Sequence, residues 1–152
     1  MLGFWLGASE IVNIEFQRSE LTASEQSVVS EGFRAQNEDL DAPEYIKERV
    51  KWLGVDELND VRAALTADIL WDWLYVDQLW VCPKLRGAGV GRQLMQLTEE
   101  FAVSQNICGI WLWTQSWQAE GFYRQLGYEQ FTRFENFPKG HSRIGMRKSL
   151  TL

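Results

Sequence analysis

The sequence has few of the residues that build metal centres and disulfide frameworks. Among its 152 residues there is one histidine, His141, and there are two cysteines, Cys82 and Cys108. One histidine and two cysteines without a metal-ligand spacing argue against a zinc site, so we expect no metal. Isolated cysteines are typical of reduced thiols in the cytoplasm, where we place the protein, and nothing in their positions supports a disulfide.

Positive charge is scarce as well. The chain has 15 lysines and arginines against 21 aspartates and glutamates, which gives a net charge of −6 and a pI of about 4.8. Phosphate backbones select basic surfaces, so we do not expect a nucleic acid as the main partner. The acidic balance leaves a cationic small molecule or peptide as a candidate partner.

Long apolar runs and linkers are also absent. The apolar stretch Met1–Gly7 has no basic segment and is soon followed by Glu10 and Glu15, so it is neither a signal peptide nor a membrane span. Three interpretations stay open for it: a lead-in to the first strand, a consequence of start-site choice, or a small contact patch. Without repeats or low-complexity runs, residues 1–152 are expected to form a single domain with a sizeable core and no membrane contact.

The most informative segment runs from Leu74 to Phe101. Residues Leu74–Val81 are apolar, aromatic and β-branched, which predicts a buried strand, and Pro83 ends it because proline has no N–H to donate. The loop Arg86–Arg92 then reads Arg-Gly-Ala-Gly-Val-Gly-Arg. The apolar residues that follow are spaced four, three and four apart, as on one face of a helix: Val90, Leu94, Leu97 and Phe101.

A strand, a glycine-rich turn and a helix N-terminus together make an anion site. The first helical turn has unpaired N–H groups, and the helix dipole adds positive potential there. Glycines let the backbone approach a ligand closely, while Lys84, Arg86 and Arg92 add fixed charge. The loop matches neither the Walker nor the Rossmann glycine pattern, but its chemistry suits a pyrophosphate. The alternative is a tight strand-to-helix turn with a solvated basic rim.

Arg86, Gly89 and Gly91 fit the pattern R-x-x-G-x-G. After a strand that ends in a Leu-Trp-Val run, this pattern resembles the coenzyme A loop of the GCN5-related N-acetyltransferases, the GNAT family. The resemblance implies that the loop binds the pyrophosphate of acetyl-CoA through Arg86, Gly87, Ala88, Gly89, Val90, Gly91 and Arg92. It also implies that the end of the preceding strand bonds the pantetheine arm, through Leu79, Trp80 and Val81.

A second segment, Ala119–Tyr128, follows the pattern A-x-x-F-Y-x-x-x-G-Y. This pattern resembles the segment after the fifth strand in GNAT enzymes, where the tyrosine often protonates the departing thiolate. The resemblance implies that Tyr123 is the general acid, and the alternative is a packed core tyrosine. Ser116 stands where family members often have asparagine, and it is our candidate for a polar contact to the pantetheine arm.

The C-terminal part of the chain narrows the resemblance to a bacterial subgroup. Trp117–Tyr123 is a near match to F-Q-A-P-x-F-Y, and Phe137–His141 reads F-P-K-G-H. The resemblance is firm from Leu74 to Leu150 and is limited to the order of elements over Ile11–Leu70. Gly121, inside a predicted short helix, suggests that a neighbour packs closely against it.

The patterns and the resemblance predict an α/β (α+β) fold with a mixed, mostly antiparallel sheet of about seven strands and helices on both faces. The strands Leu74–Val81 and Ile107–Thr114 are joined through a helix, so they should be parallel neighbours with a right-handed crossover. A capping box at Thr22–Glu25 begins a helix that ends near Gln36. The other expected strands are Ile11–Phe16, Tyr45–Val55, Val61–Leu70, Tyr128–Phe134 and Ser142–Leu150.

Acyl transfer from a thioester to an amine needs few special side chains, because the thioester is already activated. Positioning both reactants supplies up to roughly 7–11 kcal/mol, and a backbone N–H near Val81 can bond the developing oxyanion. A base must take the amine proton. Asp77, a carboxylate in a predicted buried strand, is the first candidate, unless it faces an arginine or a solvated edge. His141 is the second candidate, unless it is only a structural loop histidine.

We therefore predict an N-acetyltransferase that moves the acetyl group of acetyl-CoA to an amine of a small molecule or peptide by direct attack. The acidic balance, Asp77 and the nearby tryptophans suggest an amine that arrives as a cation. Two alternatives stay open: a protein of the same fold that binds acyl-CoA without transferring the acyl group, and an aromatic-rich interaction module whose glycine loop is only a turn. The sequence leaves monomer and homodimer open.

Overall fold

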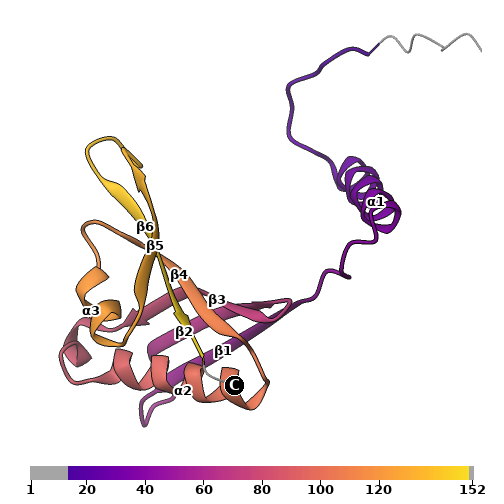
Figure 1. Cartoon of the computed structure of the whole chain (residues 1–152). Coiled ribbons are helices and arrows are strands. Elements are labelled where there is room, and N and C mark those ends of the chain that lie inside the picture. The colour runs from indigo at the N-terminus through magenta and orange to yellow at the C-terminus, as the bar shows by residue number, and fades with distance from the viewer. Residues whose placement is uncertain (1–13, 151–152) are drawn as a thin grey trace, which may run out of the picture. The chain divides into compact units, whose positions relative to one another are not determined.

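The computed structural model describes residues 14–150, and the chain divides into two units, Met1–Pro43 and Glu44–Leu152 (Figure 1). The first unit holds α1 (Ala23–Asp39), which begins at the predicted capping box. The Thr22 hydroxyl accepts from the Glu25 N–H, and the Glu25 carboxylate accepts from the Thr22 N–H. This box explains why the helix starts where the sequence predicts.

The predicted strand Ile11–Phe16 is not part of the fold as described. Its first three residues lie outside the described residues, and so does the apolar stretch Met1–Gly7. Ile14–Phe16 are described and are not in a strand, so the prediction is wrong for that half of the segment.

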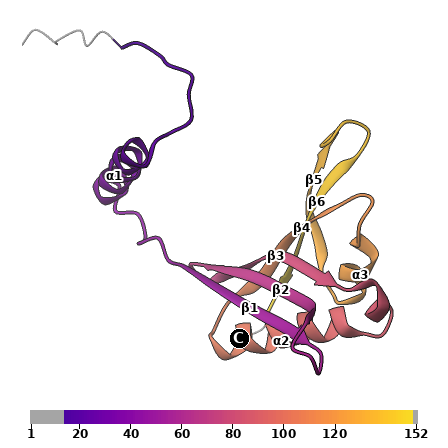
Figure 2. The same ribbon diagram turned by 180° about the vertical axis from the view of Figure 1, so that it is seen from behind.

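The second unit is built on one sheet with the strand order β1-β2-β3-β4-β6-β5 (Figure 2). Its neighbouring strands are antiparallel, except that β3 and β4 are parallel, as predicted. The mixed, mostly antiparallel sheet is therefore confirmed, with six strands among the described residues instead of about seven. The strands are β1 (Lys47–Val55), β2 (Val61–Leu70), β3 (Trp73–Val81), β4 (Gly109–Gln115), β5 (Glu129–Glu135) and β6 (Ser142–Ser149).

One face of this sheet is covered by α2 (Val90–Ser104), which lies against β2, β3 and β4. Its buried residues are Leu94, Met95, Thr98 and Ala102. Leu97, which the spacing placed on the buried face, is 47% exposed. Thr98 is buried in its place and satisfies its hydroxyl by donating to the Leu94 carbonyl at 2.8 Å. Apolar side chains of the strands complete the core, among them Leu65, Leu74, Ile110, Leu112 and Met146.

The opposite face of the second unit's sheet carries a row of aromatic rings. The rings of Tyr75 and Trp111 lie 4.4 Å apart, and the ring of Phe131 contacts those of Trp111 and Trp113. Arginines of β6 lie over the rings of Trp113 and Phe131. The predicted helices on both faces stay a prediction, because α1 belongs to the other unit.

The parallel pair β3 and β4 is short. Trp73–Val76 pairs with Gly109–Leu112, and beyond that point the two strands share no ladder. β3 continues beside β2 as far as Val81, while β4 continues beside β6 as far as Gln115. The two strands therefore part, and the opening between them lies at their carboxyl ends, next to α2 and to α3 (Glu120–Gln125).

Both cysteines are free thiols. Within residues 14–150, no group of three or more histidine, cysteine or acidic residues could hold a metal ion. No helix in this part of the chain is long and apolar enough to cross a membrane.

Candidate active site

A cavity of about 730 Å³ occupies the opening between β3 and β4. One wall is the end of β3, with Asp77, Gln78 and the predicted cofactor strand Leu79–Val81. The other wall is the end of β4 and the start of α3, with Thr114, Gln118 and Tyr123. The structure thus brings both predicted catalytic residues, Asp77 and Tyr123, to the same cavity.

A second cavity of about 510 Å³ adjoins the first and is lined by the glycine loop. Four residues line both cavities: Leu79, Val81, Arg86 and Ala119. The second cavity also contains most of the predicted pyrophosphate residues, namely Gly87, Gly89, Val90, Gly91 and Arg92. Ala88 belongs to the same loop but lines neither cavity. One continuous path therefore leads from the helix N-terminus to the opening between the strands.

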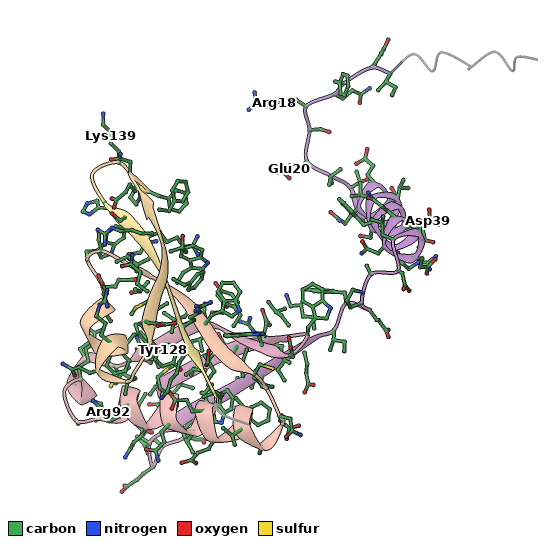
Figure 3. All side chains as sticks on the ribbon, in the orientation of Figure 1. Arg18, Glu20, Asp39, Arg92, Tyr128 and Lys139 are labelled. Atoms are coloured by element: carbon green, nitrogen blue, oxygen red, sulfur yellow. The ribbon has the colours of Figure 1, made fainter. Side chains whose placement is uncertain are left out.

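The glycine loop has the geometry of an anion site. Gly89 is the N-cap of α2 and has a φ of 84°, while Gly87 has a φ of 78°, and these left-handed conformations favour glycine. No side chain caps the helix, so the N–H groups of its first turn have no side-chain partner there. Arg92 stands in this first turn (Figure 3). A phosphate group would meet both the free N–H groups and the positive end of the helix dipole.

Arg86 joins the loop to the strand. Its Nε donates to the Val81 carbonyl at 3.1 Å, which holds the guanidinium at the border of the two cavities. An arginine in this position can offer its remaining N–H groups to an anionic ligand.

Tyr123 comes from α3 and is 8% exposed. Its ring packs edge-on against those of Phe122 and Tyr128, at 5.1 and 6.0 Å between centroids. The Tyr128 N–H also donates to the Tyr123 carbonyl at 3.0 Å. Burial raises the pKa of Tyr123 to about 12, so its hydroxyl keeps its proton at neutral pH. The side chain is a packed core residue that also lines the cavity.

Asp77 sits at an irregularity of β3. Thr66 of β2 pairs with Gln78 and the next residue, Ala67, pairs with Val76, which leaves Asp77 without a partner in the ladder. Such a bulge re-aims side chains, and here Asp77 and Gln78 both reach Thr66. Arg49 bonds Thr66 and Asp77 together, and the Thr66 hydroxyl donates to Gln78 Oε1 at 3.4 Å. Alternation along a regular strand would have placed Asp77 and Gln78 on opposite faces.

The carboxylate of Asp77 faces an arginine, which is the alternative that the sequence left open. Arg49 of β1 donates to Asp77 at 2.7 Å and also contacts the buried Asp68 at 3.1 Å. Bonds to Asp77 first, and then to Asp68, raise the pKa of the Arg49 guanidinium. One Asp77 oxygen is therefore bound to Arg49, while the other has no partner among the described residues.

Three other predicted positions lie apart from the cavities. The Ser116 hydroxyl accepts from the Ser142 N–H at 3.2 Å and lines neither cavity, and its contact to the pantetheine arm stays a prediction. The His141 ring packs edge-on against Trp117 at 4.7 Å and also lies outside both cavities. A methyl group added at Gly121 would have no described atom within 4 Å, so the close neighbour expected there is not found in residues 14–150.

Gln118 also lines the cavity, although it was not among the site residues predicted from the sequence. Its Oε1 accepts from the Gln115 N–H at 3.0 Å and lies 3.5 Å from the Thr114 hydroxyl. These contacts fix the amide at the start of α3. Its position directly before Ala119 was the one signal in the sequence. The family resemblance pointed to Ser116, where other members often have asparagine.

Comparison with known proteins agrees with this geometry. The model of the acetyltransferase (GNAT) family matches residues 14–128. Blasticidin-S acetyltransferase from Streptomyces morookaense is 35% identical over 85 residues, which are 55% of this chain and 62% of that protein. The match thus spans less than two thirds of the length of this curated relative.

Solved structures show the same fold. A crystal structure of an acetyltransferase from Bacillus cereus ATCC 14579 has a TM-score of 0.78 and 27% identity, covering 89% of this chain and 98% of that one. An aminoglycoside 6′-N-acetyltransferase complexed with coenzyme A has a TM-score of 0.63 and 18% identity, covering 77% of this chain and 79% of that one.

Proposed function

The chain belongs to the acetyltransferase (GNAT) family, and on this premise we propose that it is an N-acetyltransferase that moves the acetyl group of acetyl-CoA to an amine of a small molecule or peptide. The observation that carries the proposal is the pair of adjoining cavities. One is lined by a glycine loop at a helix N-terminus, and the other lies between parted strands with Tyr123 and Asp77 in its wall.

Acetyl-CoA fits this path by its chemistry. The N–H groups of Gly87–Gly91 and the guanidinium groups of Arg86 and Arg92 suit the pyrophosphate. Beyond Val76, β3 has no ladder with β4, so the backbone groups of Leu79–Val81 that point away from β2 can bond the amide groups of the pantetheine arm. The exception is the Val81 carbonyl, which accepts from Arg86. The thioester would then lie near the end of the opening, within the cavity that holds Tyr123.

Transfer requires one bond to form and one to break. The amine nitrogen attacks the thioester carbon, the C–S bond breaks, and the amine loses a proton to the free oxygen of Asp77 or to water. The Tyr123 hydroxyl donates toward the departing sulfur. Burial raises the pKa of Tyr123, so the hydroxyl keeps its proton until the C–S bond breaks, and a proton from solvent then restores Tyr123 after it has donated to sulfur.

A small molecule is the acceptor that the curated relative favours. The curated relative acts on blasticidin S by its name, and another solved structure of the fold is nourseothricin acetyltransferase, with a TM-score of 0.61 and 22% identity. At that identity the second likeness supports the fold alone, so the acceptor rests on the first and on the cavity.

The test is an acceptor screen. Purified protein is incubated with acetyl-CoA and a panel of amines, and release of the free thiol is followed. We expect thiol release that depends on an amine and stops when acetyl-CoA is omitted. Acetyl-CoA binding measured by calorimetry, without transfer to any amine, would favour the acyl-CoA-sensing alternative. Loss of both binding and transfer would favour an interaction module.

A further inference from the structure

The net negative charge of this protein lies outside the unit that holds the site. Residues 1–43 carry eight carboxylates and two arginines, whereas residues 44–152 carry 13 acidic and 13 basic side chains. The unit with both cavities is therefore neutral overall. The acidic balance of the whole chain gives no reason to expect a cation at the site.

The reaction cavity is not negatively charged either, because Arg86 lines it and the carboxylate in its wall is paired. Asp77 is the one carboxylate among the described residues that line the cavity, and Arg49 pairs with it at 2.7 Å. Behind this pair, Asp68 is 6% exposed and contacts both Arg49 and Lys47, at 3.1 and 3.5 Å. Two carboxylates thus face two cations, and the remaining neighbours of the pair, Thr66 and Gln78, are uncharged. An ammonium group entering the cavity would find no net negative charge.

One of the two tryptophans that line the cavity already has a cation over its ring. Trp113 lines the cavity, and the guanidinium carbon of Arg143 lies 4.8 Å from its ring centroid. Further along the same sheet face, Arg147 lies 5.9 Å from the ring of Phe131. One face of each of these rings is therefore already in contact with a cation of the protein, and a second cation close by would meet like charge. Trp80, which is 45% exposed, adds another flat wall to the cavity.

We propose that the acceptor is a weakly basic amine attached to a flat ring, such as an arylamine or a ring-bound amino group of a nitrogen heterocycle, which reaches the cavity uncharged. The proposal rests on the proposed N-acetyltransferase function and names the substrate class of the same site. It replaces the expectation of a cationic acceptor, because the charges that supported that expectation lie in the other unit or are paired.

This substrate class fits the chemistry of the cavity. An uncharged amine has its lone pair available, so no proton has to be removed before the nitrogen attacks the thioester carbon. The C–N bond forms and the C–S bond breaks, and a proton then leaves nitrogen for the free oxygen of Asp77 or for water. A base that is bound to an arginine on one side suffices for this later step, because the nitrogen becomes far more acidic once it has attacked. The ring can lie against Trp80 or Trp113.

Two isomeric amines make a sharp test: p-toluidine, an arylamine that is uncharged near neutral pH, and benzylamine, which is an ammonium ion there. Both contain one benzene ring and the same atoms. Initial rates with acetyl-CoA are measured for each, and kcat/KM values are compared. We expect p-toluidine to be favoured by about tenfold or more, the effect of an unmatched ammonium charge.

Equal or higher kcat/KM for benzylamine overturns the proposal and leaves N-acetyl transfer intact. Transfer to alkylamines alone in a wider panel has the same meaning. Transfer to no amine, with acetyl-CoA still bound, overturns the proposed function together with the proposal.

Variants at Arg49 test whether the pairing of Asp77 with Arg49 causes the preference for p-toluidine. Arg49→Met frees the charge of Asp77, so the preference for p-toluidine should fall several-fold, and Arg49→Lys should restore most of it because lysine keeps the positive charge. Arg62→Met is the matched control, because Arg62 of β2 also forms ion pairs, with Asp56 at 2.6 Å and Asp60 at 3.3 Å. Neither of these partners lines a cavity, whereas Asp77 does. An unchanged preference in Arg49→Met overturns the argument from Asp77. If that variant does not fold, Arg49→Met combined with Asp68→Asn removes the buried charge as well and gives the same readout.

Discussion

The ammonium group of Lys148 on β6 lies 2.7 Å from the carboxylate of Glu99 on α2. The same nitrogen donates to the Leu126 carbonyl at 2.9 Å, at the end of α3. Both charged side chains are largely buried, with 27% and 21% of their surface exposed. One lysine therefore joins the last strand, the helix with the glycine loop and the helix that carries Tyr123.

Replacing this lysine should destabilise the protein. Lys148→Met keeps most of the side-chain volume but leaves the Glu99 carboxylate without its partner, so we expect a loss of roughly 2–4 kcal/mol in the free energy of unfolding. Urea denaturation measures it. Arg147→Met is the control from the same strand, because its exposed pair with Glu129 should contribute less than about 1 kcal/mol. Equal losses in the two variants would contradict the role of Lys148.

Gly89→Val should weaken acetyl-CoA binding. The φ of 84° at this N-cap is strained for valine, and the new side chain would stand beside the N–H groups proposed to bind the pyrophosphate. We expect a loss of about tenfold or more in affinity by calorimetry, and parent binding should also weaken as salt is raised. Gly140→Val is the control, with a φ of 81° and the same open surroundings outside both cavities. A folded Gly89→Val protein with parental affinity would refute the loop assignment.

Tyr123→Phe should lower kcat by roughly 10²-fold or more, because the ring stays but the donor to sulfur is lost. The Kd for acetyl-CoA should change little. Tyr128→Phe is the control, since Tyr128 is also buried and packs against Tyr123 but lines neither cavity. Single-turnover measurement is needed where product release limits the rate. A single-turnover rate that is unchanged in Tyr123→Phe rules out the role.

Stability should fall at alkaline pH. In the unfolded chain the tyrosine pKa is near 10, whereas burial raises that of Tyr123 to about 12. Below pH 10 the tyrosine keeps its proton in both the folded and the unfolded state, so its full contribution to the free energy of unfolding is present. Between about pH 10 and pH 12 only the unfolded state loses it, which lowers the free energy of unfolding by about 1.4 kcal/mol per pH unit. Burial raises the pKa of Tyr128 as well, so the two effects combine.

The measurement is urea denaturation over a pH series that enters this range. The free energy of unfolding of Tyr123→Phe should fall less steeply with pH than that of the parent. The difference in slope should correspond to about one titrating proton. A parallel decline in the two proteins would show that Tyr123 titrates at the ordinary value in the folded state.

Most of the helices and strands could be predicted from local signals in the sequence. β3 ends at Val81, two residues before Pro83, and a helix begins at Val90 within the predicted glycine loop. The strand Val61–Leu70 has the predicted bounds, and the other strands predicted after Pro43 differ by one or two residues at one or both ends. These features depend on neighbouring residues, so they can be read from the chain. The strand predicted at Ile11–Phe16 is the exception, because its described residues are not in a strand.

The site was harder to predict from the sequence, because it depends on contacts between residues that are distant along the chain. Arg49 and Asp77 are 28 positions apart and meet only because β1, β2 and β3 lie side by side. The bulge at Asp77 has no marker such as glycine, and it decides where both Asp77 and Gln78 point. The charge of the site was hidden for another reason. The total of −6 is a sum over both units, and the boundary at Pro43 became clear only in three dimensions.

The short parallel pairing of β3 and β4 also has a consequence for hydrogen exchange. Beyond Val76, backbone amides of β3 that point toward β4 have no ladder partner, while those that point toward β2 do. Deuterium uptake should therefore alternate along this half of the strand, fast at one residue and slow at the next. A ligand that bonds the strand edge would slow only the fast set, so amide exchange would register the cofactor as a loss of this alternation.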